Sequence, residues 1–197
     1  MDKSICVFGA SSTQGFYDTE KGGWVERLKS FLFEKTLKTG DYYEVFNLGI
    51  SGDTSRELLA RFGNEIKFRR PSIIIISIGD NDSALKVPLD EFERNIKDIV
   101  NKAKKLTDKV LILGCKKVNE KLTNPVAWDK DVAYTNETIK EYDDRLEELS
   151  KKIGVSYLKM FELLDYNDLE DGVHPNSAGH EKIFEYAKKF MIKAGWL

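Results

Sequence analysis

The apolar run at positions 73–78 constrains the fold of this chain more than any other segment. It reads Ile-Ile-Ile-Ile-Ser-Ile. β-branched side chains favour strands, and an apolar run without alternation indicates a strand that is buried on both faces. Such strands lie at the centre of parallel sheets that helices cover on both sides. We therefore predict that this segment is a central strand of a parallel sheet.

Strand and helix patterns alternate along the whole chain. Apolar runs predict strands at 5–8, 43–46, 73–78, 110–113 and 155–158. Apolar residues at helical spacing predict helices at 24–32, 58–66, 92–103, 139–153 and 183–191. Alternating units of this kind predict an α/β fold with three layers, α/β/α, around a parallel sheet of five strands. No repeat, linker or low-complexity tract interrupts residues 1–197, so we expect a single domain.

Composition limits the classes of partner. Lys and Arg number 31 and Asp and Glu 33, so the formal net charge is -2, which favours neither nucleic acid nor an anionic membrane as a partner. No apolar run approaches the length of a membrane span, and no signal-peptide pattern precedes the first strand. We therefore expect a cytoplasmic protein. Cys6 and Cys115 fall in or beside predicted core strands, where buried thiols are expected rather than a disulfide.

Residue types that serve in nucleophilic catalysis follow the predicted strands. Ser11 comes after the first strand, Gly52 after the second and Asn81 after the third, while Asp171 and His174 form an Asp-x-x-His element after the last. In an open parallel sheet, these strand ends face one crevice. A nucleophile, candidate oxyanion donors, a base and an orienting carboxylate at one edge predict an acyl hydrolase.

The chain has two histidines, and only one has the position of a catalytic base. His180 falls inside the closing helix pattern, where a surface or packing role is expected. His174 precedes that helix, which Asn176 or Ser177 can cap. The carboxylate of Asp171 can reach a ring nitrogen of His174 and hold its tautomer, although Asp-x-x-His alone is more typical of an ordinary turn. Asp171 and the two histidines match no strong ligand pattern, so we expect no metal and no cofactor.

Gly52 and Asn81 have functional meaning only in combination with Ser11. Gly52 lies just before a helix whose start is fixed by the capping box Thr54-x-x-Glu57, and a glycine there lets the backbone approach a ligand closely. Asn81 directly follows the central strand, where its amide can donate a hydrogen bond. Each residue is by itself more typical of a turn. With the backbone N–H of Ser11 they supply three donors to an oxyanion, and loss of one such donor typically costs about 10² to 10³ in rate.

Four sequence blocks in this order resemble the SGNH hydrolases, also called the GDSL lipase/esterase family. Positions 7–15 match the first block with Ser11 as nucleophile, and positions 47–55 match the second with Gly52 as an oxyanion donor. Positions 79–82 match Gly-x-Asn-Asp with Asn81 as the side-chain donor, and positions 171–176 match the last block with His174 as base and Asp171 as its partner. The resemblance covers essentially the whole chain, and it implies a flavodoxin-like sheet of strand order 2-1-3-4-5.

The first block departs from the family pattern at one position. The family usually has Gly-Asp-Ser, and Ala10 stands where the aspartate would be. That aspartate is not one of the named catalytic groups, so the resemblance implies that the chemistry is retained. The substitution bears on the loop geometry around Ser11.

The resemblance implies a serine esterase that hydrolyses carboxylic esters through an acyl-enzyme on Ser11, and we expect a small ester with a short acyl or acetyl group. An acyl thioesterase or a lysophospholipase would use the same site. The irregular stretch 114–134 is longer than ordinary connections and favours a substrate wall, with Val126, Trp128 and Tyr134 as candidate pocket residues. These three side chains equally suit packing within a lid. Monomer and homo-oligomer both stay open at this point.

An alternative of another class is a dinucleotide-binding protein that uses the loop from Gly9 to Gly15 after the first strand. Ser12 stands where a middle glycine is needed, and positions 16–23 do not open a helix. A non-catalytic binding module with the same fold is disfavoured because every matched position holds a competent residue. The Gly-x-Ser-x-Gly elbow of α/β-hydrolases is absent around Ser11, which argues against that fold.

Overall fold

All five strands of the central sheet run parallel, in the order β2-β1-β3-β4-β5, in a computed structural model that describes residues 3–197. The strands are β1 (Lys3–Gly9), β2 (Tyr43–Gly49), β3 (Ile73–Ser77), β4 (Val110–Leu113) and β5 (Ser156–Leu158). The predicted fold class and strand order are thus confirmed. The central strand ends one residue earlier than predicted, because the backbone turns at Gly79, whose φ is 134°.

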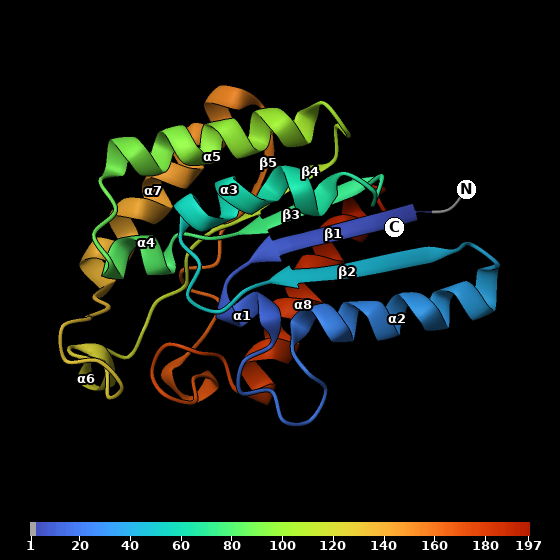
Figure 1. Cartoon of the computed structure of the whole chain (residues 1–197). Coiled ribbons are helices and arrows are strands. Elements are labelled where there is room, and N and C mark those ends of the chain that lie inside the picture. The colour runs from blue at the N-terminus through green and yellow to red at the C-terminus, as the bar shows by residue number, and fades with distance from the viewer. Residues whose placement is uncertain (1–2) are drawn as a thin grey trace.

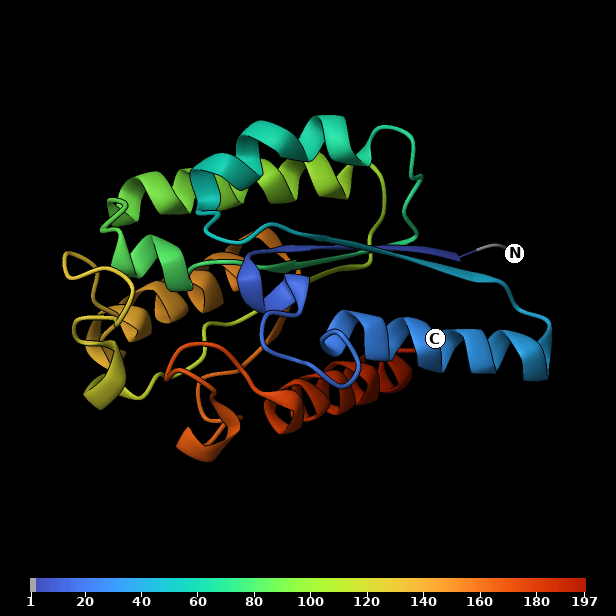
Figure 2. The same ribbon diagram turned by 60° about the horizontal axis from the view of Figure 1, so that its bottom comes forward.

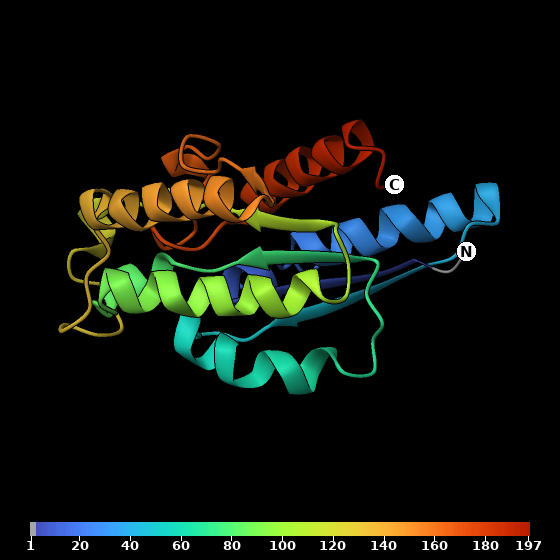
Figure 3. The same cartoon turned by 90° about the horizontal axis from the view of Figure 1, so that it is seen from above.

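Helices cover both faces of the sheet (Figures 1 and 2). One face carries α2 (Trp24–Thr39) and α8 (Ser177–Lys193). The other carries α3 (Ser55–Ile66), α5 (Leu89–Lys104) and α7 (Asn136–Ile153), which lie side by side when seen from above (Figure 3). Residues 3–197 also form four short helices: α1 (Ser11–Gln14), α4 (Asp80–Ala84), α6 (Glu120–Thr123) and the 3₁₀ helix η1 (Tyr166–Asp168).

Side-chain alternation along the inner strands builds two separate cores. On β1, Ile5 and Val7 face the layer of α2 and α8, whereas Cys6 and Phe8 face the layer of α3, α5 and α7. The four isoleucines of β3 divide between the two cores in the same way, and all of them are fully buried. Burial on both faces explains why this strand lacks polar alternation.

The strands end in register at one edge of the sheet. Gly9 pairs with Gly49 on one side and with Ser77 on the other, and Leu113 pairs with Ser77 and Leu158. The segments that follow these residues therefore leave the sheet at the same level, on the same side. That level is where the candidate site residues lie.

Helix boundaries follow the expected chemistry. The capping box at the start of α3 forms, with the backbone N–H of Thr54 donating to Glu57 at 2.9 Å. Asn176 caps α8 by accepting a hydrogen bond from the N–H of Gly179 at 3.1 Å. Among the described helices, none is long and apolar enough to cross a bilayer.

The two cysteines are free thiols in the core, as the sequence predicts. Cys6 is fully buried on β1, and Cys115 is almost fully buried just after β4. Burial raises the pKa of the Cys6 thiol to about 12 and also raises that of Cys115, so both stay protonated at neutral pH.

Candidate active site

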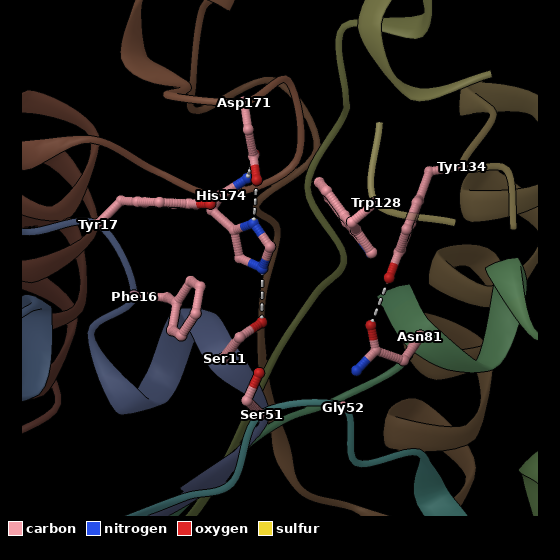
Figure 4. Close-up of a pocket in the computed structure, with 10 residues that line it drawn as sticks. All are labelled: Ser11, Phe16, Tyr17, Ser51, Gly52, Asn81, Trp128, Tyr134, Asp171 and His174. Carbon is pink, nitrogen blue, oxygen red and sulfur yellow. Dashed lines mark hydrogen bonds and ion pairs between the residues drawn. The ribbon is translucent and has the colours of Figure 1, made fainter. Parts of the chain in front are cut away.

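Ser11, His174 and Asp171 form a continuous chain of hydrogen bonds at the carboxyl edge of the sheet (Figure 4). The Oγ of Ser11 lies 2.9 Å from Nε2 of His174, and Nδ1 of the same ring lies 2.7 Å from Oδ2 of Asp171. Ser11 and His174 are 163 positions apart in sequence, and only the fold brings them together. The arrangement is that of a nucleophile, a base and an orienting carboxylate.

The partners of His174 determine its tautomer. Burial would raise the pKa of Asp171, but hydrogen bonds from the His174 ring and from the backbone N–H groups of His174 and Val173 outweigh it and hold this pKa below its ordinary value. An ionised carboxylate only accepts, so Nδ1 of His174 carries the proton. The lone pair of Nε2 then faces the hydroxyl of Ser11, as a general base requires.

The loop that carries Asp171 and His174 is tied down on both sides. The backbone N–H of Glu170 donates to the carbonyl of His174 at 2.8 Å, and that of Asn176 donates to the carbonyl of Asp168 at 2.8 Å. Asn176 is the N-cap of α8, so His174 lies two residues before the cap of a long helix. A catalytic group on a rigid support keeps its geometry better than one on a free loop.

Ala10 leaves the first block in a competent conformation. Its carbonyl accepts hydrogen bonds from the N–H groups of Thr13 and Gln14, both at 3.0 Å, which closes the turn that begins at Ser11. Gly15 ends this turn with a φ of 100°, and a side chain there would collide with the backbone at Gly22. The glycine therefore serves turn geometry. Because α1 is a single short turn and the next helix starts only at position 24, no observation favours the dinucleotide alternative.

Gly52 lies in a loop that is fixed around it. Its φ is 85°, which favours glycine, and its N–H has no protein acceptor within residues 3–197. The preceding Ser51 donates its N–H to the side chain of Gln14 at 3.0 Å, and the following Asp53 forms an ion pair with Arg61 at 2.6 Å. The loop thus keeps a free backbone donor at the pocket.

Asn81 lies in α4, with its side chain bound at both ends. Its Nδ2 donates to the backbone carbonyl of Asp53 at 2.9 Å, and its Oδ1 accepts from the hydroxyl of Tyr134 at 2.7 Å. One of the two Nδ2 hydrogens is left for another acceptor. Asn81 and Gly52 both line the pocket that contains Ser11, so the structure brings the predicted donors together (Figure 4).

The carboxyl group of Asp82, the residue after Asn81, links α4 to α3. Asp82 is fully buried, and both of its oxygens lie 3.0 Å from the N–H of Ser55 at the start of α3. Burial raises the pKa of Asp82 to about 6, although the hydrogen bonds from Ser55 oppose the shift. This contact joins α4 to α3 and so fixes the relative position of the Asn81 and Gly52 segments.

An open pocket of about 360 Å³ surrounds these groups. Its lining residues are Ser11, Phe16, Tyr17, Ser51, Gly52, Asn81, Trp128, Tyr134, Asp171 and His174. Three partly exposed aromatic rings surround the imidazole of His174, at centroid distances of 5.2 Å for Phe16, 5.5 Å for Tyr17 and 5.8 Å for Trp128. Tyr17 adopts a positive φ of 63°, a strained conformation for a bulky residue that is typical of functional sites.

The three candidate substrate residues of the long connection do not all lie in the pocket. Trp128 and Tyr134 line the pocket, as expected for a substrate wall. Val126 does not line this pocket: its side chain is 2% exposed and packs in the core beneath the loop, which is the other role that the sequence left open. Backbone pairing of Val126 with Asp129 and Val132 holds this part of the loop as a tight turn over that core.

Phe16, Tyr17 and Ser51 line the pocket without having been predicted from the sequence. The signal that was available is their position, because Phe16 and Tyr17 directly follow the first block and Ser51 directly precedes Gly52. Residues next to catalytic ones at a strand end share the same crevice.

Comparison with known proteins identifies the class of protein that this fold and site define. The family model of the GDSL-like lipase/acylhydrolase family matches residues 7–182, so the chain belongs to that family. The chain is 24% identical over 213 residues to the GDSL esterase/lipase WDL1 of Oryza sativa subsp. japonica, covering 96% of this chain and 78% of that protein. It is 26% identical over 209 residues to an isoamyl acetate-hydrolyzing esterase 1 homolog of Mus musculus, covering 91% and 78%.

Solved structures show the same fold. A catalytic mutant of Axe2, an acetylxylan esterase from Geobacillus stearothermophilus, superposes with a TM-score of 0.75 at 21% identity, covering 95% of this chain and 93% of that one. LAE5, an enzyme from the metagenome of Lake Arreo, superposes with a TM-score of 0.76 at 20% identity, covering 99% and 96%. Together with the family match, the named esterase relatives identify this chain as a carboxylic ester hydrolase.

Proposed function

We propose that this protein is a serine esterase that hydrolyses small esters with a short acyl group, acetyl esters in particular, through an acyl-enzyme on Ser11. The observation that carries the proposal is the hydrogen-bond chain from Ser11 through His174 to Asp171 on the wall of an open pocket. Gly52 and Asn81 line the same pocket, and each has an N–H group available to donate to an oxyanion.

The reaction follows from these positions. His174 takes the proton of the Ser11 hydroxyl through Nε2 while Oγ attacks the acyl carbonyl carbon. Asp171 stabilises the imidazolium that forms. The N–H groups of Ser11 and Gly52 and the side chain of Asn81 hold the negative charge on the former carbonyl oxygen. His174 then protonates the leaving alcohol, and a water molecule repeats the sequence on the acyl-enzyme to release the acid.

Two observations favour a short acyl group. The pocket of about 360 Å³ lies near the lower end of the roughly 300 to 1,000 Å³ typical of ligand sites. Two of the similar proteins carry an acetyl ester in their names, isoamyl acetate in one and acetylxylan in the other. A long-chain acyl thioester or lysophospholipid would use the same catalytic groups, and a series of esters of increasing acyl length distinguishes these substrates from short-chain esters.

The first test is hydrolysis of p-nitrophenyl esters of increasing acyl length by the wild type and by Ser11→Ala. We expect turnover that falls as the acyl chain lengthens, and a loss of about 10³-fold or more in Ser11→Ala because the nucleophile is gone. Ser150→Ala is the matched control, since Ser150 is a buried serine on α7 whose hydroxyl bonds the carbonyl of Leu146 outside the pocket. Ser11→Ala with wild-type activity contradicts the proposal.

Labelling with a fluorophosphonate tests the nucleophile independently of the substrate. We expect one adduct, located by peptide mass spectrometry on Ser11, and no adduct in Ser11→Ala or in His174→Ala at the same reagent concentration. An adduct on another serine contradicts the assignment of the nucleophile. A labelled protein without activity on the ester series places the error in the acyl preference rather than in the catalytic groups.

A further inference from the structure

The two hydrogen bonds of the Asn81 side chain differ in chemical kind, and together they fix the amide in one orientation. The carbonyl of Asp53 only accepts, so the atom that faces it at 2.9 Å is Nδ2. The remaining oxygen, Oδ1, only accepts, so Tyr134 must donate its hydroxyl proton to it at 2.7 Å. The Tyr134 hydroxyl thus donates its only proton to the side chain of Asn81.

We propose that Tyr134 is a positioning residue of the oxyanion site, which orients and polarises the amide of Asn81 through its hydroxyl. This inference rests on the proposed function, because it assigns a role within the same reaction. A hydrogen bond accepted by an amide oxygen draws electron density from the amide nitrogen. The N–H of Asn81 that is left for the oxyanion therefore becomes a stronger donor.

Tyr134 is held rigidly enough to act in this way. Its backbone N–H donates to the carbonyl of Thr123, and the hydroxyl of Thr123 donates to the carbonyl of Tyr134, both at 2.9 Å. Thr123 is fully buried and Tyr134 is only 7% exposed. The long connection after β4 is therefore fastened at the point where it delivers the tyrosine hydroxyl to Asn81 (Figure 4).

The surroundings also keep the hydroxyl in its donating form. Burial raises the pKa of Tyr134, and the negative charges of Asp80 and Asp171 raise it further. The phenol therefore stays protonated throughout the range in which an esterase works. A bond between two buried neutral groups is little weakened by water, so its effect on the amide persists.

Tyr134→Phe removes the hydroxyl and keeps the ring in the pocket wall. We expect kcat to fall about tenfold with KM little changed, because the lost interaction acts in the transition state. The matched control is Tyr142→Phe, which removes another buried tyrosine hydroxyl, one that donates to the carbonyl of Val87 outside the pocket. A Tyr134→Phe enzyme with the wild-type kcat overturns the inference.

A double-mutant cycle with Asn81→Ala shows whether Tyr134 acts through Asn81. Asn81→Ala alone should lower kcat by about 10² to 10³. If the inference holds, adding Tyr134→Phe to Asn81→Ala lowers kcat no further, since the group that the tyrosine polarises is absent. If the two losses multiply instead, Tyr134 acts on the substrate directly and the inference is wrong.

A spectroscopic measurement tests the contact without any substrate. In ¹⁵N-labelled wild type, the side-chain amide signals of Asn81 are identified by their loss in Asn81→Ala. We expect Tyr134→Phe to shift these signals and Tyr142→Phe to leave them in place. Unchanged Asn81 signals in Tyr134→Phe contradict the inference. If the wild type turned over no ester while this shift occurred, the proposed function would fail and the contact would stand.

Discussion

The two histidines of this chain show how neighbours decide what a buried imidazole can do. His174 and His180 are six positions apart, and they are 8% and 0% exposed. Both rings use both nitrogens for hydrogen bonds within the protein. Their partners differ, however, because His174 binds two reactive side chains and His180 binds two backbone groups.

These partners impose opposite tautomers. Nδ1 of His174 donates to Asp171, so its Nε2 is free to accept a proton from Ser11. Nδ1 of His180 accepts from the N–H of Trp24 at 3.2 Å, so its Nε2 donates to the carbonyl of Phe16 at 3.0 Å. A backbone N–H and a carbonyl cannot exchange protons with the ring at neutral pH. His180 therefore joins α2, α8 and the Phe16 loop, which is the packing role that its place in the helix pattern predicts.

The largest expected effect is on catalysis by His174. We predict that His174→Ala lowers kcat/KM on p-nitrophenyl acetate by about 10³-fold or more, because the Ser11 hydroxyl loses its base. The melting temperature should change little, since the ring lies on the wall of an open pocket. Steady-state kinetics and thermal unfolding measure the two quantities. More than a tenth of the wild-type activity in this variant would contradict the assignment of the base.

His180→Ala should produce the reverse pattern. The substitution leaves a cavity and two unpaired backbone groups in a fully buried place, and we predict a loss of about 2 to 4 kcal/mol in the free energy of unfolding. Urea unfolding measures this loss. The folded variant should keep most of its kcat, with an increase in KM, because Phe16 lines the pocket. A loss of kcat as large as that in His174→Ala would erase the distinction between the two histidines.

The smallest effect concerns pH. Burial lowers the pKa of His180, although the hydrogen bond to the Phe16 carbonyl opposes the shift. His180 in its neutral form contributes its full share to the free energy of unfolding above the pKa of the unfolded state, about 6.5. Below that pH the unfolded chain binds a proton that the folded chain refuses, so stability falls by at most about 1.4 kcal/mol per pH unit. We predict that His180→Gln, which keeps a donor and an acceptor, removes this fall.

The difference between the unfolding curves of wild type and His180→Gln from pH 5 to pH 8 isolates this term. Asp82 acts with the opposite sign: its pKa of about 6 lies above the unfolded value near 4, so stability falls as the pH rises between the two. Both proteins contain Asp82, and its contribution cancels in the difference. A difference curve that is flat below pH 6.5 would show that His180 does not titrate as its burial requires.

Much of the fold could be predicted because its signals are local. The apolar run of β3 and the helical stripes required only periodicity, and the capping box at Thr54 and Glu57 required only spacing. The members of the candidate site could be predicted because each follows a strand, and parallel strands end at one edge. The contacts of the long connection could not be predicted, because the sequence does not show which way the tertiary packing turns each side chain. Val126 turns into the core, whereas Tyr134 reaches Asn81.

The sequence by itself determined which residues reach the carboxyl edge of the sheet, because the local hydrophobic pattern locates the strand ends and parallel strands end at one edge. Only the tertiary structure decided how those residues act on one another. The contact of His174 with Ser11 at 2.9 Å, for example, depends on segments 163 positions apart meeting in one orientation. Periodicity carries no information about such angles, and for that reason the bond between Tyr134 and Asn81 emerged from the fold alone.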